Sequence, residues 1–281
     1  MLKPLNKHFA PKSVMPEKVI QFGEGNFLRA FVDWIIWNMD QKTNFNGSVV
    51  VVQPIDKGMV EWLNGQDCLY HVNLQGRENG KPVNTLERID VISRALNPYS
   101  QNDAFMALAD QPEIRFVISN TTEAGIAFDP ACKLEDKPAS SYPGKLVQLL
   151  YRRYQTFNGD PTKGLIIFPC ELIFLNGHVL KDCINKYIEL WQLPADFKKW
   201  FDECCGVYAT LVDRIVPGFP RKEIAEIQEK VGYRDNLVVQ AENFHLWVIE
   251  APRRLLLSSP PTRLACTCCL FPLRSPTTSV R

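Results

Sequence analysis

The sequence has no run of about 18 apolar residues and no block of basic residues. Without such a run, no transmembrane helix is expected. With 32 Lys and Arg against 31 Asp and Glu, the net charge is near zero, so neither nucleic acid nor an anionic membrane is indicated as a partner. Residues 1–16 also lack the apolar core of a secretory signal, which favours a cytoplasmic protein.

Disulfide and zinc spacings are also missing, although the chain has nine cysteines. Three of them crowd the C-terminal segment without a second ligand pair or a nearby histidine, so no metal site is expected there: Cys266, Cys268 and Cys269. The other six are scattered and are expected to be reduced, buried thiols: Cys68, Cys132, Cys170, Cys183, Cys204 and Cys205.

What the sequence does contain is a regular alternation of apolar strands and amphipathic helices. Residues 49–52 form a continuous β-branched run, which is typical of a parallel strand buried on both faces. The alternation predicts an α/β protein with a doubly wound, mostly parallel sheet, in one large domain or two small ones. Strands are expected at 19–22, 48–53, 114–119 and 164–169, and helices at 142–157, 179–191 and 196–204.

The first strand runs into a glycine turn, Gly23-Glu24-Gly25, and then into a predicted helix that Asn26 is expected to cap. Such a turn lets the backbone approach the pyrophosphate of a dinucleotide, and the N-terminus of a helix favours the phosphates. Leu28, however, stands where the usual G-x-G-x-x-G motif has its third glycine. The residues alone therefore leave a cofactor site and an ordinary strand–turn–helix corner equally open.

The end of the second strand carries one carboxylate, Asp56, at the place where dinucleotide folds often bind the adenosine ribose. No arginine stands there to bind a 2′-phosphate, although Lys57 is available. This pattern favours NAD over NADP.

Two further stretches carry polar residues next to apolar ones. Residues 120–125 follow the third strand and fit either the ligand edge of an open sheet or an ordinary loop, which the residues alone slightly favour. The adjacent pair Asp213 and Arg214 has apolar neighbours, so it is not expected on an open surface. It fits an internal ion pair or a carboxylate beside a polar substrate.

Four stretches occur together in one order: GEGNFLRAF at 23–31, SNTTEAG at 119–125, PCEL at 169–172 and TLVDRIVP at 210–217. In this combination the chain resembles the polyol-specific long-chain dehydrogenases, the mannitol dehydrogenase family, from its first strand to about Pro252. The resemblance implies a Rossmann-like NAD-binding domain over residues 1–252. It also implies a metal-independent oxidoreductase that interconverts D-altronate and D-tagaturonate, with a mannitol or mannonate type of dehydrogenase as the alternative.

Carried over position by position, the resemblance assigns the site. Asp213 matches a family aspartate near the reacting carbon, and the substrate side also includes Glu171, Asn176 and Arg214. Mannitol dehydrogenases have Asp-Asn where this chain has Glu171-Leu172, a departure that fits a different substrate. The cofactor would contact Asp56, the glycine turn and its flanks, and, on the nicotinamide side, residues after the third strand: Ile20, Gln21, Phe22, Gly23, Glu24, Gly25, Asn26, Phe27, Leu28, Arg29, Ala30, Phe31, Asn120, Thr121, Thr122 and Glu123.

The family's general base is a lysine in a K-x-x-x-x-N-x-x-H motif of a C-terminal helical domain. The last lysine here is Lys230 and the last histidine is His245, so the motif is absent. Residues 253–281 contain no Asp, Glu, Lys, Asn or Gln, and we expect them to be an aberrant, disordered tail translated out of frame. This predicts a chain that binds NAD but transfers hydride poorly. A non-catalytic NAD-binding fragment, or a sensor built on the same sheet, is the alternative.

Overall fold

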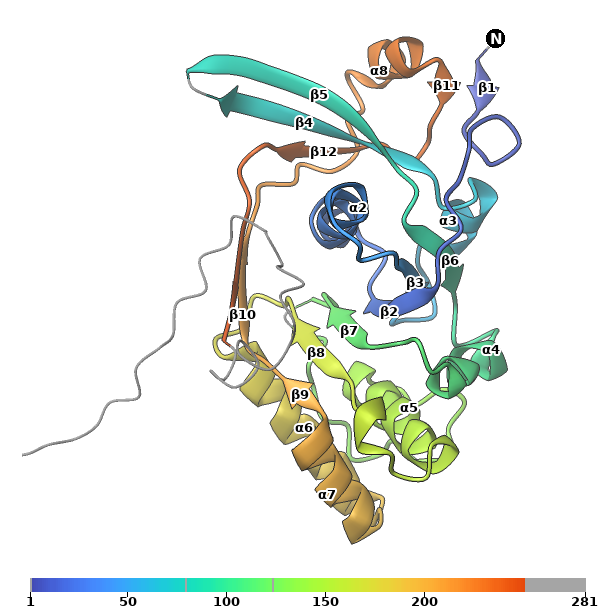
Figure 1. The fold of residues 1–281 in the computed structure, drawn as a ribbon, viewed down its shortest axis with the longest axis vertical. Coiled ribbons are helices and arrows are strands. Elements are labelled where there is room, and N and C mark those ends of the chain that lie inside the picture. The colour runs from blue at the N-terminus through green and yellow to red at the C-terminus, as the bar shows by residue number, and fades with distance from the viewer. Residues whose placement is uncertain (1, 79, 123, 251–281) are drawn as a thin grey trace, which may run out of the picture.

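A six-stranded parallel sheet forms the centre of the computed structural model, which describes residues 2–78, 80–122 and 124–250 (Figure 1). Its strand order is β6-β3-β2-β7-β8-β9, and every neighbouring pair is parallel. The order reverses at β2, which is the Rossmann arrangement, so the predicted fold class is confirmed. The strands are β2 (Glu17–Phe22), β3 (Ser48–Val52), β6 (Ile92–Leu96), β7 (Phe116–Ser119), β8 (Ile166–Pro169) and β9 (Gly206–Val207).

The sheet is buried on both faces, as the β-branched run in β3 predicts. Val50 and Val52 belong to the apolar cluster on one face, and Val49 and Val51 belong to the cluster on the other. All four are fully buried. This alternation follows from the two-residue period of a strand.

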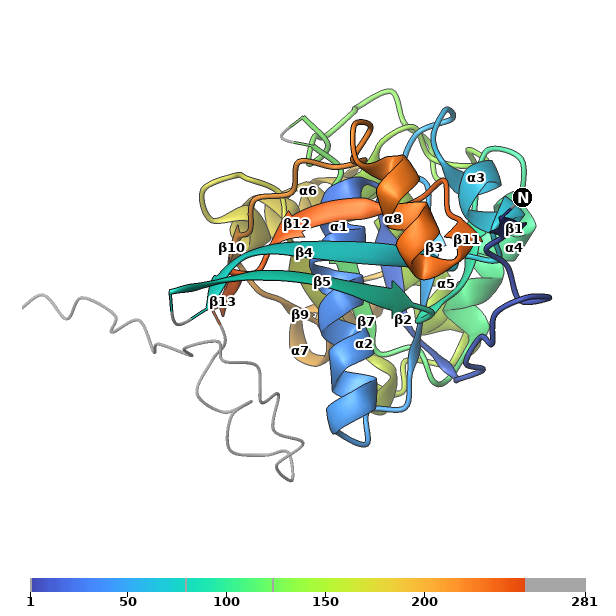
Figure 2. The ribbon, with the colours of Figure 1, turned by 90° about the horizontal axis from the view of Figure 1, so that it is seen from above.

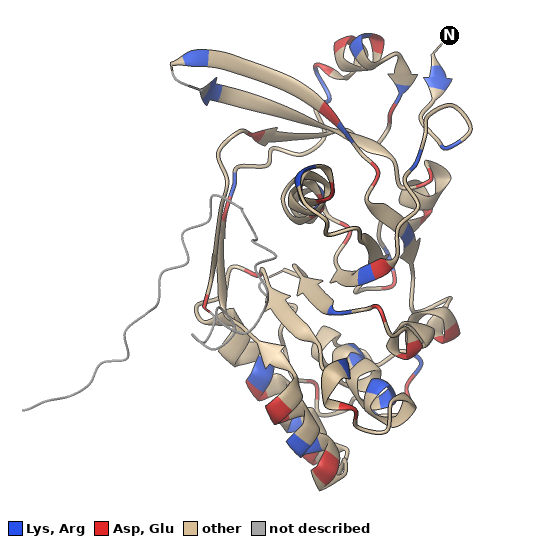
Figure 3. Cartoon of the chain, in the orientation of Figure 1, with Lys and Arg blue, Asp and Glu red and all other residues tan. Residues whose placement is uncertain are grey.

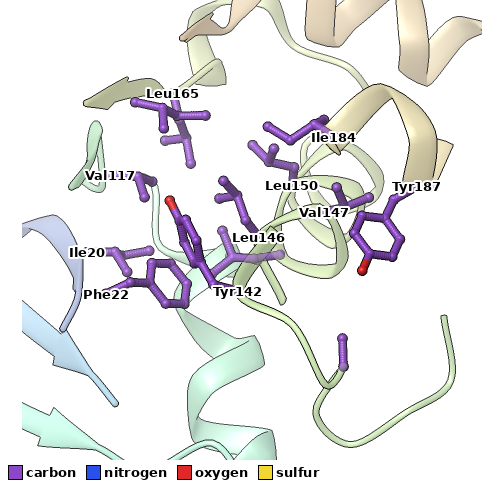
Figure 4. Close-up of a cluster of buried hydrophobic side chains, with 14 of the residues drawn as sticks. Ile20, Phe22, Val117, Tyr142, Leu146, Val147, Leu150, Leu165, Ile184 and Tyr187 are labelled. Carbon is purple, nitrogen blue, oxygen red and sulfur yellow. The ribbon is translucent and has the colours of Figure 1, made fainter. Parts of the chain in front are cut away.

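Helices α4 (Asn102–Met106), α5 (Tyr142–Thr156), α6 (Asn176–Leu190) and α7 (Ala195–Cys204) cover the first face, together with the short 3₁₀ turns η1 (Ala107–Asp110) and η2 (Pro161–Lys163). Figure 4 shows Ile20 and Phe22 of β2 meeting Tyr142 and Leu146 of α5. Helix α5 begins where expected because Ser141 caps it: its Oγ accepts a hydrogen bond from Gly144 N at 3.0 Å. Both basic and acidic residues occur along α6 and α7 (Figure 3).

A small sheet covers the helices on the other face, where α1 (Asn26–Ala30), α2 (Val32–Lys42) and α3 (Val60–Gly65) lie. It has the order β12-β4-β5, with β4 (Tyr70–Glu78), β5 (Lys81–Ile89) and β12 (Val239–Glu242). Helix α2 lies between the two sheets, and β4 and β5 cross over it when seen from above (Figures 1 and 2).

From the sequence alone, residues 70–74 and 88–93 are expected to pair as strands, but the hairpin of β4 and β5 pairs a longer stretch. Only Tyr70↔Ile89 and His71↔Arg88 follow that expectation, and the antiparallel ladder continues out to Glu78↔Lys81. Residues 92–93 belong instead to β6 of the large sheet. The outer half of the hairpin is polar and exposed, so no apolar period marks it in the sequence.

The remaining elements of the described chain are two short two-stranded sheets and helix α8 (Ile224–Val231), which follows β10 in the sequence. Strand β1 (Lys3–Pro4) pairs with β11 (Tyr233–Arg234), and β10 (Thr210–Asp213) pairs antiparallel with β13 (Leu246–Ile249). Trp247 of β13 packs on Phe31 and Phe168, with ring centroids 5.7 and 5.9 Å away, and so ties the β10–β13 pair to the main sheet.

The six cysteines in the described chain are free thiols, and four of them are buried, in line with the sequence prediction. Cys204 and Cys205 are only partly buried. No helix within the described ranges is long and apolar enough to cross a membrane. The tail predicted at 253–281 lies outside the described residues.

Candidate active site at the carboxyl edge of the sheet

The turns that follow β2, β7 and β8 are held side by side at one edge of the sheet. The parallel ladders continue past the strand ends: Gly23 N donates to Val52 O at 3.0 Å, and Asn120 N donates to Phe22 O at 3.0 Å. Cys170 N in turn donates to Ser119 O at 2.7 Å. Three of the four motif stretches therefore meet at the point where the strand order reverses, which is where open α/β sheets bind ligands.

The two glycines of the first turn have different tasks. Gly23 has φ +123°, a conformation that L side chains rarely adopt, and a Cβ there would lie 2.8 Å from the carbonyl oxygen of Asn120. Gly25 has φ −66°, is exposed and would have no neighbour within 4 Å of a Cβ. Gly23 thus lets the first two turns touch, and Gly25 leaves open space above the turn.

The helix after the turn is broken, contrary to the single helix that the sequence predicts. Phe31, at φ −118° and ψ −75°, separates the five-residue α1 from α2. The predicted cap is also wrong: Gly25 is the N-cap, and the Asn26 side chain accepts a hydrogen bond from Arg29 Nη2 at 2.6 Å instead. A helix of five residues has only a small dipole. The open backbone of the turn is therefore the stronger feature for binding a phosphate.

Arg29 supports the glycine turn from the protein interior. Its side chain is 1% exposed, and its guanidinium donates to Glu24 O at 3.2 Å and to Leu237 O at 2.7 Å. It also lies over the ring of Tyr70 at 5.2 Å. Arg29 therefore links the glycine turn to the segment that leads into β12.

Gln21 and Asp33 form a second support under the turn. Gln21 Nε2 donates to Gly23 O at 3.1 Å and to Asp33 Oδ2 at 3.3 Å, and both side chains are fully buried. Burial raises the pKa of Asp33 to about 7, although hydrogen bonds from Gln21 and Tyr70 and the charge of Arg29 oppose the rise. Gln21 Oε1 and Asp33 Oδ1 are buried without a hydrogen-bond partner.

We expect Asp33→Asn to remove a pH dependence of stability. The folded state keeps the carboxyl proton up to about pH 7, and the unfolded chain keeps it only to about pH 4. Stability therefore falls as pH rises through that window, by on the order of 3 kcal/mol between pH 5 and pH 8. Urea unfolding of both proteins at the two pH values measures the difference. Equal pH dependence in the two proteins would contradict the raised pKa.

A cavity of about 590 Å³ opens beside the turn. Its lining combines residues from α1, from the loops after β7 and β8, and from β10: Phe27, Asn120, Thr122, Ala124, Glu171, Leu172 and Val212. The sequence does not assign Leu172 and Val212 to the site, and it includes Ala124 only within the stretch 120–125. Val212 could have been found from the strand period, because it alternates with its exposed neighbours on β10.

Glu171 lies at the wall of this cavity but is only 2% exposed. Its Oε1 accepts hydrogen bonds from Thr121 N at 3.0 Å and Thr121 Oγ1 at 2.9 Å, and its Oε2 accepts one from Ser119 Oγ at 3.1 Å. Burial raises the pKa of Glu171, and these hydrogen bonds oppose that rise.

The loop after β7 has an unusual conformation. Thr122 has φ +84°, which is rare for a β-branched residue and costs on the order of 1–3 kcal/mol. The loop is tight, since Gly125 N donates to Thr122 O at 3.0 Å. Asn120 Nδ2 donates to Cys170 O at 2.6 Å, which fixes the start of the loop. Glu123 lies outside the described residues.

The substrate-side residues named from the sequence do not all reach the cavity. Asp213 follows Val212 on β10, and its side chain is exposed on the opposite face of that strand. Because Asp213 is exposed, the expected internal ion pair does not form with Arg214, which is buried. Its guanidinium donates to Ala30 O at 2.6 Å and Glu242 O at 2.9 Å.

Asn176 is fully buried, and its side-chain amide forms hydrogen bonds with backbone groups. Its Nδ2 donates to the carbonyl oxygens of Pro169, Glu171 and Thr210 at 3.0, 3.0 and 3.1 Å. Its Oδ1 accepts from Thr210 N and Gly177 N, both at 2.8 Å. The side chain thus joins β8, α6 and β10, and it is not among the residues that line the cavity.

Asp56 is exposed in the segment that follows β3. A second cavity of about 610 Å³ is lined by Asn26, Arg29, Met59, Trp62, Phe219, Arg221 and Asn236. The other predicted cofactor residues, Ile20, Phe22, Leu28, Ala30 and Phe31, are 0–1% exposed and form the core beneath the turn.

Comparison with known proteins agrees with this architecture. The family model "Mannitol dehydrogenase Rossmann domain" matches residues 17–256. The chain is 72% identical over 275 residues to an altronate oxidoreductase of Phocaeicola vulgatus, covering 98% of this chain and 57% of the relative. It is 48% identical over 252 residues to that of Bacillus subtilis, covering 89% and 52%. The matched stretch therefore runs beyond Pro252 in the first relative.

The fold also matches a solved structure, a Pseudomonas fluorescens mannitol 2-dehydrogenase in a ternary complex with NAD and D-mannitol, with a TM-score of 0.73 at 20% identity. That match covers 89% of this chain and 55% of the other. The chain spans about half the length of the relatives it matches. By its sequence and its sheet, this chain belongs to the mannitol dehydrogenase family and contains that family's Rossmann domain.

Proposed function

We propose that this chain binds NAD(H) across the carboxyl edge of its six-stranded sheet, as the cofactor-binding part of an oxidoreductase that interconverts D-altronate and D-tagaturonate. The names of the relatives support the substrate: two proteins at 72% and 48% identity are altronate oxidoreductases. The solved relative with NAD bound supports the cofactor.

The observation that carries the proposal is the glycine turn at the reversal of strand order. A Cβ on Gly23 would collide with Asn120 O, whereas the space above Gly25 is open. Backbone can therefore come close to a pyrophosphate there. The neighbouring cavity of about 590 Å³ also falls in the size range of small-molecule sites.

Within this proposal the two halves of the cofactor lie on either side of the turn. Asn120, Thr121 and Thr122 line the nicotinamide side, and NADH when bound supplies the hydride. Asp56 accepts hydrogen bonds from the adenosine ribose, and the absence of an arginine beside it in the sequence favours NAD over NADP.

We assign the substrate side to the loop after β8 and to β10. For Asp213 we propose a contact with the substrate outside this cavity, because its side chain is exposed on the face of β10 opposite Val212. Arg214 and Asn176 act by holding β10, through the carbonyl of Ala30 and the backbone of Thr210. The proposal makes no use of a metal ion.

Binding and turnover test the proposal separately. We expect a purified protein of residues 1–281 to bind NADH, measured by fluorescence, and to oxidise it slowly or not at all with D-tagaturonate, because these residues do not contain the K-x-x-x-x-N-x-x-H motif. Parallel assays with NAD and D-mannitol or D-mannonate check the alternative substrates. Absence of NADH binding would overturn the proposal. Turnover at an ordinary enzymatic rate would overturn the claim that the lysine motif is required.

A further inference from the structure

Glu171 is a cavity residue whose carboxylate is already occupied. Both oxygens accept hydrogen bonds from the end of β7 and the loop that follows, three in total, from Ser119 and Thr121. The side chain is 2% exposed, and no ion pair in the described part of the chain includes it. Its oxygens therefore face the protein, which does not suit a direct contact with a substrate.

The loop after β7, to which Glu171 is hydrogen-bonded, contains a residue in an unfavourable backbone conformation. Thr122 is β-branched and has φ +84°, a conformation that persists only where the surroundings fix it. Its neighbour Thr121 is fixed twice by Glu171, through the backbone N–H and through the hydroxyl. On the other side, Gly125 packs so closely that a Cβ there would lie 2.0 Å from Thr121 Oγ1.

The hydrogen bonds of Glu171 fix part of the cavity wall. Asn120 and Thr122 both line the cavity, and they flank the residue that Glu171 anchors. Asn120 is also tied to the backbone of Cys170, the residue before Glu171. The loops after β7 and β8 are therefore joined, and the joint sets the shape of the wall.

We propose that Glu171 is a positioning residue for the nicotinamide end of the cofactor. It acts through Thr121 to keep Asn120 and Thr122 in the cavity wall, and it does so by accepting hydrogen bonds and not by its charge. This inference rests on the proposed NAD(H) binding, and it replaces the direct substrate contact that the sequence resemblance implies for Glu171.

Three variants separate the possible roles of Glu171. Glu171→Gln keeps one acceptor for Thr121 N–H, and its amide N–H can donate to a hydroxyl oxygen of Ser119 or Thr121. Glu171→Met keeps the approximate size and removes all three hydrogen bonds. Thr121→Val removes a single hydroxyl donor without changing the shape, and it is the milder variant if Glu171→Met does not fold. Glu189→Gln, at an exposed position on α6, is the control.

Two ligands separate positioning of the nicotinamide from general loss of structure. NADH carries the nicotinamide ring, whereas ADP-ribose has only the adenosine, pyrophosphate and ribose part. We expect Glu171→Met to weaken NADH about tenfold or more and ADP-ribose less than about twofold, both measured by calorimetry. Thr121→Val should show the same selectivity with a loss of about three- to tenfold in NADH affinity. Glu171→Gln and the control should bind both ligands within about twofold of the wild type.

The outcomes distinguish the inference from the function on which it rests. Loss in Glu171→Gln as large as in Glu171→Met would assign the effect to charge and overturn the inference. Equal losses for NADH and ADP-ribose would show a purely structural role and also overturn it. Failure of the wild-type chain to bind either ligand would overturn the proposed function, and the inference with it.

Discussion

Gly23→Ala is expected to lower the affinity for NADH by at least a hundredfold. The substitution puts a side chain on a residue at φ +123°, and the new Cβ would lie 2.8 Å from the carbonyl oxygen of Asn120. The turn must then open or the loop after β7 must move, and either change disturbs both sides of the cofactor site. The strain alone costs on the order of 1–3 kcal/mol of stability. Fluorescence titration with NADH and thermal unfolding measure the two effects.

Two other glycines provide matched controls for this substitution. Gly65→Ala adds a Cβ at the end of α3, where nothing lies within 4 Å, and should leave NADH affinity unchanged. Gly25→Ala should fold normally, because its φ of −66° suits alanine, but should weaken NADH because the Cβ enters the space above the turn. Wild-type affinity in Gly23→Ala would show that the turn is not the phosphate site.

Asn176→Ala is expected to destabilise the protein by about 3–5 kcal/mol. The side chain makes five hydrogen bonds to backbone groups of β8, α6, β10 and the β8–α6 loop. Alanine would leave several of those buried groups without a partner, at about 1–3 kcal/mol each before relaxation. Urea unfolding measures the loss.

Asn84→Ala, at an exposed position of β5, is the control for Asn176→Ala and should change stability by less than about 0.5 kcal/mol. A loss below about 1 kcal/mol in Asn176→Ala would mean that β10 is held mainly by other contacts. Asn176 would then be free for the substrate role that the sequence resemblance implies.

Local features of the fold could be predicted because their signals lie within a few residues. Residues 49–52 alternate between the two faces, as any buried parallel strand must. The turn at Gly23 and the loop at 120–125 were placed at strand ends, and parallel strands bring those ends to one edge. The position of the cavity was therefore within reach of the sequence.

Pairings between distant residues were not predictable in the same way. A buried arginine next to an aspartate suggests an ion pair, but Arg214 finds backbone carbonyls 184 and 28 residues away. The strand period then turns Asp213 outward, because Val212 takes the inward place. Likewise Glu171 meets groups 50 and 52 residues away, and no local pattern marks them as partners.

The central claim is that the carboxyl edge of the sheet holds NAD(H), and an NADH titration of the purified chain tests it most directly. We expect saturable binding of one NADH per chain, a shift in nicotinamide emission, displacement by ADP-ribose, and weaker binding of NADPH. Gly23→Ala should lose this signal while Gly65→Ala keeps it. A titration that does not saturate, or one that is the same in the wild type and Gly23→Ala, would contradict the claim.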